Sequence, residues 1–507
     1  MYKEIKTVIF IFCLIKLTLH LIADYHSGFQ GDELLHIETG NHLSFGYMEF
    51  PPLIGFLAFI QNSFHSNSVF IHHFFVHLAS LIILIYTAKT TVELGGKTKA
   101  VFLVLLCILI APGFGRSQQL FQPVVFSQLF WVLSFYQLTK YVKYLEVKYL
   151  WYLTFTVCFG FLTKYDIVFF IAGLPILLCF QKIRQKLIEQ KFWKNILFFL
   201  VIISPNILWQ FLNDFPLIQM LNRLYETQLN ELTIIGVLGK LILSINPLSL
   251  FLLIPAIIFL FHTRENKKYI PIALTIIIST LVLTFSQGKQ YYFFPIILTL
   301  LPFGSVYWET KILNKTKWLI YPLPITLLTG ITLIPFGMPV YSLENYINYD
   351  YQYEKNEIEG GEYGIHFEER YSKQKWDETM FHLRTVYDSL SEFEKKNTLI
   401  WGKHYSQAGA VNLLGTDYNL PKSFSYHGSF YIWAPTGQMP NTIIALSNGD
   451  AGIDFFEPFF EDVKPVKKMY NPYADEKSKL WQTIYICKNP KEDFDTMKIL
   501  FKNRIFE

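Results

Sequence analysis

The sequence contains little charge and little cysteine. Only 17% of its 507 residues are charged, whereas 52% are hydrophobic and 18% aromatic. A soluble domain rarely combines so few charges with a mean hydropathy of +0.28. The five cysteines do not form the pattern of a disulfide framework. The sequence also shows no internal repeat and no low-complexity tract, so a repeat protein and a disordered protein are both excluded.

Long apolar runs are abundant instead, and they predict a polytopic membrane protein. A helix needs roughly 20 apolar residues to cross a bilayer. Residues 7–22 resemble a signal peptide, but no small-residue cleavage site follows, so we interpret them as a retained first helix. The sequence predicts about eleven transmembrane helices, over residues 6–24, 68–88, 100–114, 123–139, 149–163, 165–180, 196–211, 235–261, 269–286, 290–306 and 319–338.

The block 149–180 requires two spans rather than one. As a single helix it would be about 48 Å long at 1.5 Å per residue, which exceeds one crossing. The sequence "TKYD" at residues 163–166 interrupts it near the middle. We therefore expect one helix to end, and another to begin, near Lys164.

Lys and Arg are distributed unequally between the loops, and this predicts the topology. With the N-terminus in the cytoplasm, nineteen Lys and Arg residues fall in cytoplasmic segments before residue 338 and four in the external loops of the same region. The cytoplasmic set is Lys3, Lys6, Lys89, Lys97, Lys99, Lys140, Lys143, Lys148, Lys182, Arg184, Lys186, Lys191, Lys194, Arg264, Lys267, Lys268, Lys311, Lys315 and Lys317. The external set is Arg116, Lys164, Arg223 and Lys289.

The composition changes after residue 338. The sequence predicts a transmembrane domain at 1–340, with an external loop at 25–67, and an extracytoplasmic α/β domain at 341–507. Residues 377–396 are expected to form an amphipathic helix. Residues 398–402, 442–447 and 481–487 are expected to form strands.

The first external loop lacks Lys and Arg entirely. Residues 28–53, "GFQGDELLHIETGNHLSFGYMEFPPL", hold four carboxylates and two histidines. Asp32 has two interpretations. It could be the N-cap of a short helix, with Glu33 favoured by the helix dipole, or it could be a general base that activates a hydroxyl group.

The four external cations also have two interpretations. Each one alone could extend its charged end toward lipid headgroups. Together, however, they lie on the side of the membrane where the topology rule predicts few positive charges. Several cations that converge there could bind a phosphate at the membrane surface. A lipid phosphate is a good leaving group that needs cations but no acid, so one carboxylate base could suffice for an inverting sugar transfer, unlike the two carboxylates of hydrolases.

Several segments resemble, in order and spacing, the dolichyl-phosphate-mannose–protein mannosyltransferase family. This family includes the bacterial aminoarabinose transferases and has the GT-C membrane fold. The similar segments are Asp32-Glu33, "FGYMEFPPL" (45–53), "QPVVFSQLFWVL" (122–133), "GFLTKYDIVFF" (160–170), "GKQYYFFPIILTLLPFGS" (288–305), "YSQAGAVNLLG" (405–415) and "LPKSFSYHGSFYIWAP" (420–435).

The resemblance implies roles for particular residues. Asp32, with Glu33 beside it, corresponds to the catalytic base. The donor phosphate and its lipid would be bound by Lys164, Lys289, Tyr291 and Tyr292, with Arg116 added as an external cation. Many members carry an acidic residue in the fourth-helix segment. This chain has Val124, Ser127 and Gln128 there instead, so that carboxylate does not carry over.

Four further residues are candidates for binding the sugar or the acceptor: His36, Glu49, Gln122 and His427. The aromatic sequence around His427 (426–433) could equally be an ordinary strand. His73 and His77 have a spacing that can ligate a metal, but a third ligand is not evident. We therefore expect no required cofactor, and a divalent metal is not indicated.

The sequence thus predicts a glycosyltransferase in the plasma (inner) membrane. It would move a sugar, with inversion, from a polyprenyl-phosphate donor to an extracytoplasmic acceptor, a lipid, glycan or protein hydroxyl group. Its partners would be this donor, the lipid bilayer and the unknown acceptor, and no nucleic acid is expected. Two alternatives belong to other classes. One is a secondary transporter, although repeated halves and a midplane site are not evident; the other is a membrane scaffold with an external binding domain.

Overall fold

The computed structural model describes residues 2–262, 264–316, 323–350, 356–358, 361–363, 370–449, 452–471, 474 and 479–506. The chain divides into two compact units. The first consists of Met1–Leu21, Phe50–Leu53 and His73–Met338. The second consists of Ile22–Glu49, Ile54–His72 and Pro339–Glu507, so most of the loop at 25–67 is grouped with the C-terminal residues.

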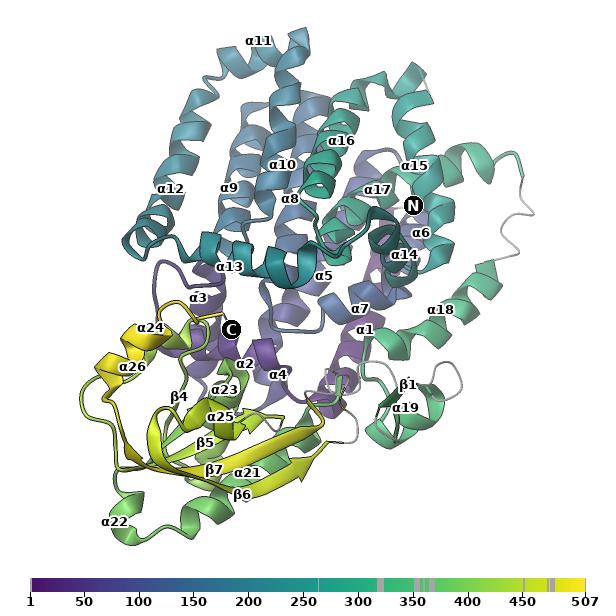
Figure 1. Ribbon diagram of the computed structural model, residues 1–507. Coiled ribbons are helices and arrows are strands. Elements are labelled where there is room, and N and C mark those ends of the chain that lie inside the picture. Colours follow the sequence, from purple (N-terminus) through teal and green to yellow (C-terminus); the bar gives the residue numbers. More distant parts are fainter. Residues whose placement is uncertain are drawn as a thin grey trace. The chain divides into compact units, whose positions relative to one another are not determined.

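The first unit is helical (Figure 1). Its helices are α1 (Tyr2–Ser27, whose last turns are counted with the second unit), α5 (Phe74–Glu93), α6 (Thr98–Leu109), α7 (Pro112–Ser117), α8 (Pro123–Tyr144), α9 (Val147–Thr163), α10 (Ile167–Gly173), α11 (Gln181–Glu189), α12 (Trp193–Leu212), α13 (Pro216–Leu224), α14 (Ile234–Ser244), α15 (Leu250–His262), α16 (Ile270–Phe285), α17 (Phe294–Tyr307) and α18 (Leu323–Gly337).

Several of these helices are long and apolar enough to cross a membrane. Five helical stretches of the described chain qualify: Lys3–Ser27, Phe74–Glu93, Trp193–Leu212, Lys267–Phe285 and Gln290–Ile312. The pair Ile167–Cys179 and Gln181–Glu189, bent by 103°, would be a sixth. Shorter apolar helices account for other predicted spans. The chain is a multi-pass membrane protein, and the count of eleven spans stays a prediction.

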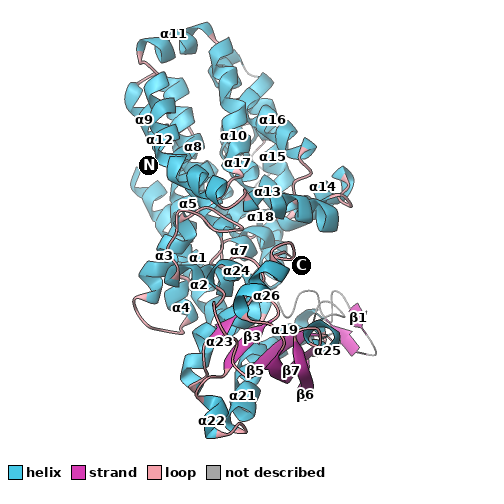
Figure 2. Ribbon diagram, turned by 60° about the vertical axis from the view of Figure 1, so that its left-hand side comes forward, coloured by secondary structure: helices cyan, strands magenta, loops and turns pink. Residues whose placement is uncertain are grey.

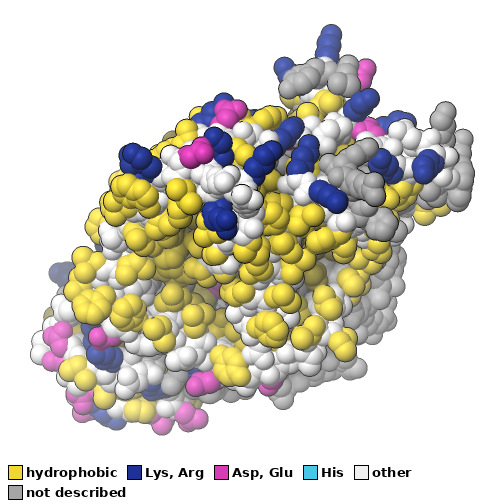
Figure 3. Space-filling model, turned by 90° about the horizontal axis from the view of Figure 1, so that it is seen from above, with side chains coloured by type: hydrophobic (Ala, Val, Ile, Leu, Met, Phe, Trp, Pro, Cys, Tyr) yellow, Lys and Arg dark blue, Asp and Glu magenta, His cyan; other side chains and the backbone are white. Residues whose placement is uncertain are grey.

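Apolar side chains on the surface of this unit are consistent with lipid contact. Helix α12 exposes Leu200, Val201, Leu208, Phe211 and Leu212 by 52–70% of their surface. Such an extended apolar face is unusual for a soluble monomer. Figure 3 shows a broad hydrophobic area with Lys and Arg gathered in a band beside it.

The helix is interrupted where two predicted spans meet. Helix α9 ends at Thr163 and α10 begins at Ile167, as the sequence "TKYD" predicts. In contrast, the predicted single span 235–261 is wrong, because it consists of two helices, α14 and α15. The reason is Asn246-Pro247: proline disfavours the helical conformation at the preceding residue, and Asn246 adopts a φ of 67°. Lys317 and the first residues of the predicted span 319–338 lie outside the described residues.

The second unit combines helices with a sheet (Figure 2). Its helices are α2 (Gly31–Glu38), α3 (Leu53–Asn62, whose first residue is counted with the first unit), α4 (Val69–His72), α19 (Leu343–Asp350), α21 (Lys373–Asp388), α22 (Glu392–Lys395), α23 (Tyr405–Leu414), α24 (Phe430–Trp433), α25 (Gly452–Phe456) and α26 (Phe494–Phe501). Strands β1 (Asn356–Ile358) and β2 (Gly361–Tyr363) form an antiparallel pair.

The main sheet has five strands in the order β4-β3-β5-β7-β6. These are β3 (Leu399–Gly402), β4 (Ser423–Phe424), β5 (Thr442–Asn448), β6 (Phe460–Tyr470) and β7 (Trp481–Pro490). Strand β3 pairs in parallel with β4 and β5, whereas β7 is antiparallel to β5 and β6. Strand β5 is buried along most of its length and lies at the centre of the core. The three strands predicted from the sequence are present.

Two local predictions in this region are wrong. The helix expected over 377–396 ends at Asp388, because Ser391 and Glu394 form a new capping box that starts α22. Residues 426–433 do not form a strand: Phe430–Trp433 is the short helix α24.

The start of the loop at 25–67 is hydrogen-bonded to C-terminal residues of the same unit. The carbonyl oxygen of Phe29 accepts hydrogen bonds from Trp376 Nε1 at 2.9 Å and from Ser372 Oγ at 2.5 Å. Both donors are buried. These bonds fix the chain immediately before α2, the helix that carries Asp32.

Candidate functional site

Asp32 lies in the first turn of α2 but does not cap it. The N-cap is Gln30, whose Oε1 accepts from the Asp32 N–H at 2.9 Å. Glu33 Oε2 accepts from the Gln30 N–H at 2.8 Å, which completes a reciprocal capping box. The interpretation of Asp32 as the N-cap is therefore wrong. The buried Glu33 has that structural role, and a catalytic role for it stays a prediction.

Two glycines bring α2 close to α23. A Cβ atom at Gly409 would lie 2.9 Å from Leu34 Cβ, and one at Gly31 would lie 3.1 Å from Ser406 Cβ. A larger residue at Gly409 would force the helices apart, because contacts under 3.0 Å are not tolerated between such atoms. This close packing places the first residue of α23 against the first turn of α2.

That first residue is Tyr405, which holds the Asp32 carboxylate. The Tyr405 hydroxyl donates a hydrogen bond to Asp32 Oδ1 over 2.6 Å. Burial raises the pKa of Tyr405 well above its ordinary value of 10, and the charges of Asp32 and Glu49 add to this effect. The phenol is therefore neutral at pH 7 and remains a donor to the carboxylate.

Two imidazoles stack beside this pair. The His427 ring lies 4.8 Å from the Tyr405 ring and 4.4 Å from the His404 ring, centroid to centroid. Burial lowers the pKa of His427 to about 4, although Asp32 acts in the opposite direction, and burial lowers the pKa of His404 well below 6.5. Both imidazoles are neutral at pH 7, so Asp32 has no cationic partner among them.

Glu49 is a half-buried carboxyl group near Asp32. Its Oε1 accepts from the Ser429 N–H at 2.8 Å, and its Oε2 accepts from the Ser429 hydroxyl. Burial raises the pKa of Glu49 to about 7, and the Asp32 charge adds to the rise. Gly428, with a φ of 59°, comes so close to Glu49 Oε1 that a Cβ atom there would clash.

These contacts unite residues from distant parts of the sequence. Asp32, Glu49 and His427 were predicted as site residues, and each belongs to this cluster within the second unit. Tyr405, His404 and Ser429 were not predicted. Tyr405 lies in a segment that resembles the family, and Ser429 lies in the aromatic segment 426–433, whereas His404 lies in neither. A tyrosine that starts a helix carries no chemical signature of its own.

His36 lies on α2, and His42 in the loop that follows stacks on the Trp433 ring. His36 is buried on α2, and its role stays a prediction. The His42 ring stacks on Trp433 with centroids 4.3 Å apart and an interplanar angle of 8°. Glu38 lies next to His42, with Oε1 3.3 Å from Nε2.

In the first unit, Lys164 lies at the break between α9 and α10. Its Nζ donates to Asp166 Oδ2 at 3.0 Å and lies 3.7 Å from the centroid of the Tyr292 ring. Tyr291 is farther away, at 5.7 Å, and stacks on Tyr292 with centroids 4.7 Å apart. The predicted lysine and both predicted tyrosines are therefore neighbours, although about 130 residues separate them in the sequence.

A carboxylate also lies against α8, although α8 itself does not supply one at Val124, Ser127 or Gln128. The Ser127 hydroxyl lies 2.8 Å and 2.9 Å from the two carboxylate oxygens of Asp166. Asp166 is 9% exposed. It was not singled out from the sequence, because it follows Lys164 by only two residues and resembles an ordinary helix cap.

The remaining predicted residues of the first unit lie at helix ends. Lys289 precedes Tyr291, and its Nζ donates to Gln228 Oε1. Arg116 belongs to α7, whose Phe114 contacts Phe294 with centroids 5.4 Å apart. Gln122 is the N-cap of α8, and its N–H donates to the Leu120 carbonyl at 2.8 Å.

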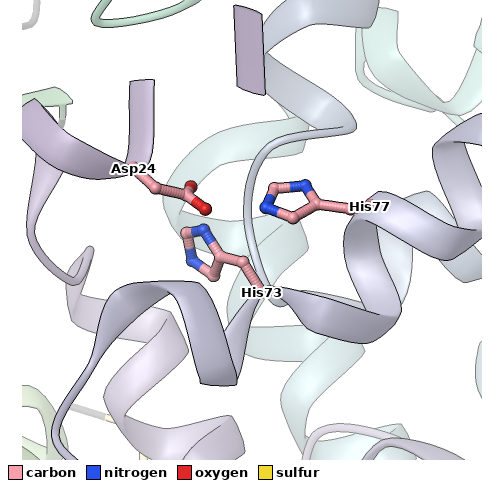
Figure 4. Close-up of side chains that lie close together, drawn as sticks. All are labelled: Asp24, His73 and His77. Carbon is pink, nitrogen blue, oxygen red and sulfur yellow. The ribbon is translucent and has the colours of Figure 1, made fainter. Parts of the chain in front are cut away.

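His73 and His77 lie at the start of α5 (Figure 4), with ring centroids 6.0 Å apart. Asp24, also drawn in Figure 4, is counted with the second unit. A structural zinc site takes four ligands, and a catalytic one at least three from the protein. The two imidazoles of the first unit supply two such ligands.

The comparisons with known proteins agree with this architecture. Residues 49–209 match the family model described as dolichyl-phosphate-mannose-protein mannosyltransferase. No curated protein matches the sequence.

Two solved structures of ArnT from Cupriavidus metallidurans are similar in fold. The apo structure has a TM-score of 0.60 at 10% identity, and the structure bound to undecaprenyl phosphate has a TM-score of 0.57 at 10% identity. Each alignment covers 94% of this chain and 97% of the ArnT chain. The chain therefore has the GT-C fold, and its residues 49–209 are similar to the dolichyl-phosphate-mannose-protein mannosyltransferase family.

Proposed function

We propose that this protein is a membrane glycosyltransferase that moves a sugar from a polyprenyl-phosphate donor to a hydroxyl group of an extracytoplasmic acceptor. The observation that carries the proposal is the Asp32 carboxylate, which is held by the Tyr405 hydroxyl and is not used as a helix cap. The family match and the fold support the transferase activity. The ArnT structure bound to undecaprenyl phosphate supports a polyprenyl phosphate as the lipid partner.

The proposed reaction is a single inverting displacement. The acceptor oxygen attacks the anomeric carbon while the bond between that carbon and the phosphate oxygen breaks. The phosphate leaves with the bonding electron pair, and the acceptor proton passes to the Asp32 carboxylate. Tyr405 orients this carboxylate, and the neutral His427 beside it does not neutralise its charge.

On the donor side, we propose that Lys164, Lys289 and Arg116 bind the phosphate, with Tyr291 and Tyr292 contacting the donor. Negative charge on the phosphate grows as the sugar leaves, so a fixed ammonium group stabilises the transition state more than the ground state. Lys164 meets this requirement, because its Nζ is fixed by Asp166 and by the Tyr292 ring.

On the acceptor side, we propose that Glu49 and His427 bind the sugar or the acceptor next to Asp32. Glu49 has a pKa of about 7, so near neutral pH its carboxyl group can accept a hydrogen bond or donate one. The same role for His36 and Gln122 rests on sequence position alone.

We also propose the arrangement in the membrane. The N-terminus lies in the cytoplasm, and transfer takes place outside the plasma (inner) membrane. Residues 1–340 form the transmembrane domain with the external loop 25–67, and residues 341–507 form the extracytoplasmic domain. The Lys and Arg asymmetry between loops supports this orientation.

The direct test is a transfer assay with a panel of labelled polyprenyl-phosphate sugars. Membranes that contain the protein are incubated with each donor, and the loss of label from the lipid is compared with that in membranes without the protein. We expect one or a few donors to lose their sugar, with inversion at the anomeric carbon. Equal loss in both membranes for every donor would contradict the proposal.

A further inference from the structure

Asp166 occupies a position where aspartate normally caps its own helix. It is the N-cap residue of α10, yet its side chain forms no cap hydrogen bond. An N-cap Asp normally stabilises the first turn of its helix by accepting a backbone hydrogen bond. The carboxylate is instead directed to Lys164 Nζ, at 3.0 Å, and to the Ser127 hydroxyl. Asp166 therefore does not stabilise α10 by capping it, and instead contacts Lys164 at the end of α9 and Ser127 on α8.

The pair formed by Lys164 and Asp166 is largely withdrawn from water. The Lys164 side chain is 18% exposed and that of Asp166 is 7% exposed. A charged group buried to this extent needs an opposite charge beside it. Asp166 supplies that charge for Lys164, while the Tyr292 ring covers the ammonium group from another side, 3.7 Å away.

A donor phosphate that binds to Lys164 meets this carboxylate. Two like charges several ångströms apart repel each other, and the repulsion is larger near a partly buried site than in water. Ser127 keeps the carboxylate in place through its hydroxyl group, so Asp166 cannot simply turn away into solvent.

We propose that Asp166 is the counter-ion of Lys164. It pairs with the Lys164 ammonium group when no donor is bound, and it competes with the donor phosphate for that group when the donor binds. This inference rests on the proposed role of Lys164 in donor binding. Asp166 is a positioning residue rather than a catalytic one. It keeps the Lys164 ammonium group charged and ordered between turnovers. It also weakens the binding of the lipid phosphate that remains after the sugar has left.

The test measures the binding of undecaprenyl phosphate to the purified full-length protein in detergent. In Asp166→Asn, the side chain keeps its shape but loses its charge, and we expect undecaprenyl phosphate to bind about 10-fold more tightly. A merely structural role predicts the opposite sign, because damage to the site does not tighten binding. Equal or weaker binding by the folded variant would overturn the inference.

A second variant and a matched control complete the experiment. Ser127→Asp adds a second carboxylate next to that of Asp166 and should weaken binding about 10-fold; unchanged binding in a folded protein would contradict the inference even if Asp166→Asn does not fold. Glu189→Gln removes the partner of Lys186 in an exposed ion pair of 2.6 Å and should leave binding unchanged. A shift in this control as large as that of Asp166→Asn would also count against the inference.

Lys164→Ala distinguishes a failure of the proposed donor site from a failure of the counter-ion inference. If it leaves the binding of undecaprenyl phosphate unchanged, the proposed donor site at Lys164 fails. If it weakens binding whereas Asp166→Asn does not tighten it, the donor site stands and only the counter-ion inference fails.

Discussion

A single hydrogen bond connects Asp32 to α23, and its loss should be measurable. In Tyr405→Phe the hydroxyl that donates to Asp32 Oδ1 at 2.6 Å is absent, while the ring can still stack against His404 and His427. We expect turnover to fall about 10-fold, within the range of a mispositioned general base. Thermal unfolding should change little. Wild-type turnover in this variant would show that Asp32 is oriented by other contacts.

Glu49 should make the stability of the protein depend on pH. Its pKa rises from an ordinary 4.5 to about 7 on folding, mainly through burial. Stability from this group is therefore full below about pH 4.5 and is lost as the pH rises through about 7. The loss can reach about 3 kcal/mol. Between pH 5 and pH 8 the thermal unfolding midpoint of the wild type should fall relative to that of Glu49→Gln, because the opposite effect of the neutral His404 and His427 is common to both proteins.

The control for Glu49 is an exposed glutamate of the same unit. The side chain of Glu392 is 87% exposed, so Glu392→Gln should keep the wild-type pH dependence. An identical pH dependence in Glu49→Gln and the wild type would mean that Glu49 does not titrate in this range.

The sequence draws attention to some residues of the two clusters and not to others. Asp32, Glu49 and His427 stand out because a loop without Lys or Arg, or an aromatic segment, draws attention to them. Tyr405, Ser429 and Asp166 do not stand out, because their roles depend on contacts with residues more than 370 positions away or on a side chain that leaves its usual cap position.

At the scale of elements, the break between α9 and α10 is the most informative feature of the first unit. It places Lys164 against Tyr292, in the segment that also contains Lys289. We expect Lys164→Ala and Lys289→Ala to lower turnover and to weaken donor binding. The reason is that each removes a charge from the phosphate site. Transfer rates and donor affinities of the purified variants provide the measurement.

Arginine and a remote lysine serve as controls for this prediction. Lys→Arg at either position should rescue only part of the activity, because a planar guanidinium group does not replace a compact ammonium group. Lys186→Ala, in the exposed helix α11, should have no effect on transfer. If Lys164 and Lys289 prove as dispensable as Lys186, they only interact with lipid headgroups.

Element boundaries followed from the sequence where a strong local signal exists. The interruption at 163–166 and the strands β3, β5 and β7 were predicted correctly, because apolar runs and turn residues delimit them. The split between α14 and α15 was missed, because a single Asn-Pro pair lies within an otherwise continuous apolar run. The helix α24 was missed because four aromatic and β-branched residues favour a strand in isolation.

At the scale of the whole molecule, the expected orientation in the membrane can be tested independently of catalysis. The nineteen-to-four contrast in Lys and Arg predicts that the C-terminus lies outside the cytoplasm. A reporter that is active only outside the cytoplasm, fused after residue 507, should therefore be active. A reporter that is active only in the cytoplasm should be inactive at the same position, and the reverse pattern would invert the topology.

The fold class could be predicted from composition and hydrophobic runs, since these alone distinguish a multi-pass membrane protein from a soluble one. The grouping of residues 22–49 with the C-terminal residues could not. It depends on glycine contacts between α2 and α23 and on the bonds to the Phe29 carbonyl, which no periodicity in the sequence reveals.

The central claim is that Asp32 accepts a proton during sugar transfer, and Asp32→Asn tests it most directly. The measurement is the rate of sugar transfer by the purified variant, alongside its affinity for undecaprenyl phosphate. We expect turnover to fall by at least about 100-fold, the scale of a lost general base, while the protein stays folded and its affinity for the lipid changes little. Near-wild-type turnover in Asp32→Asn would contradict the account.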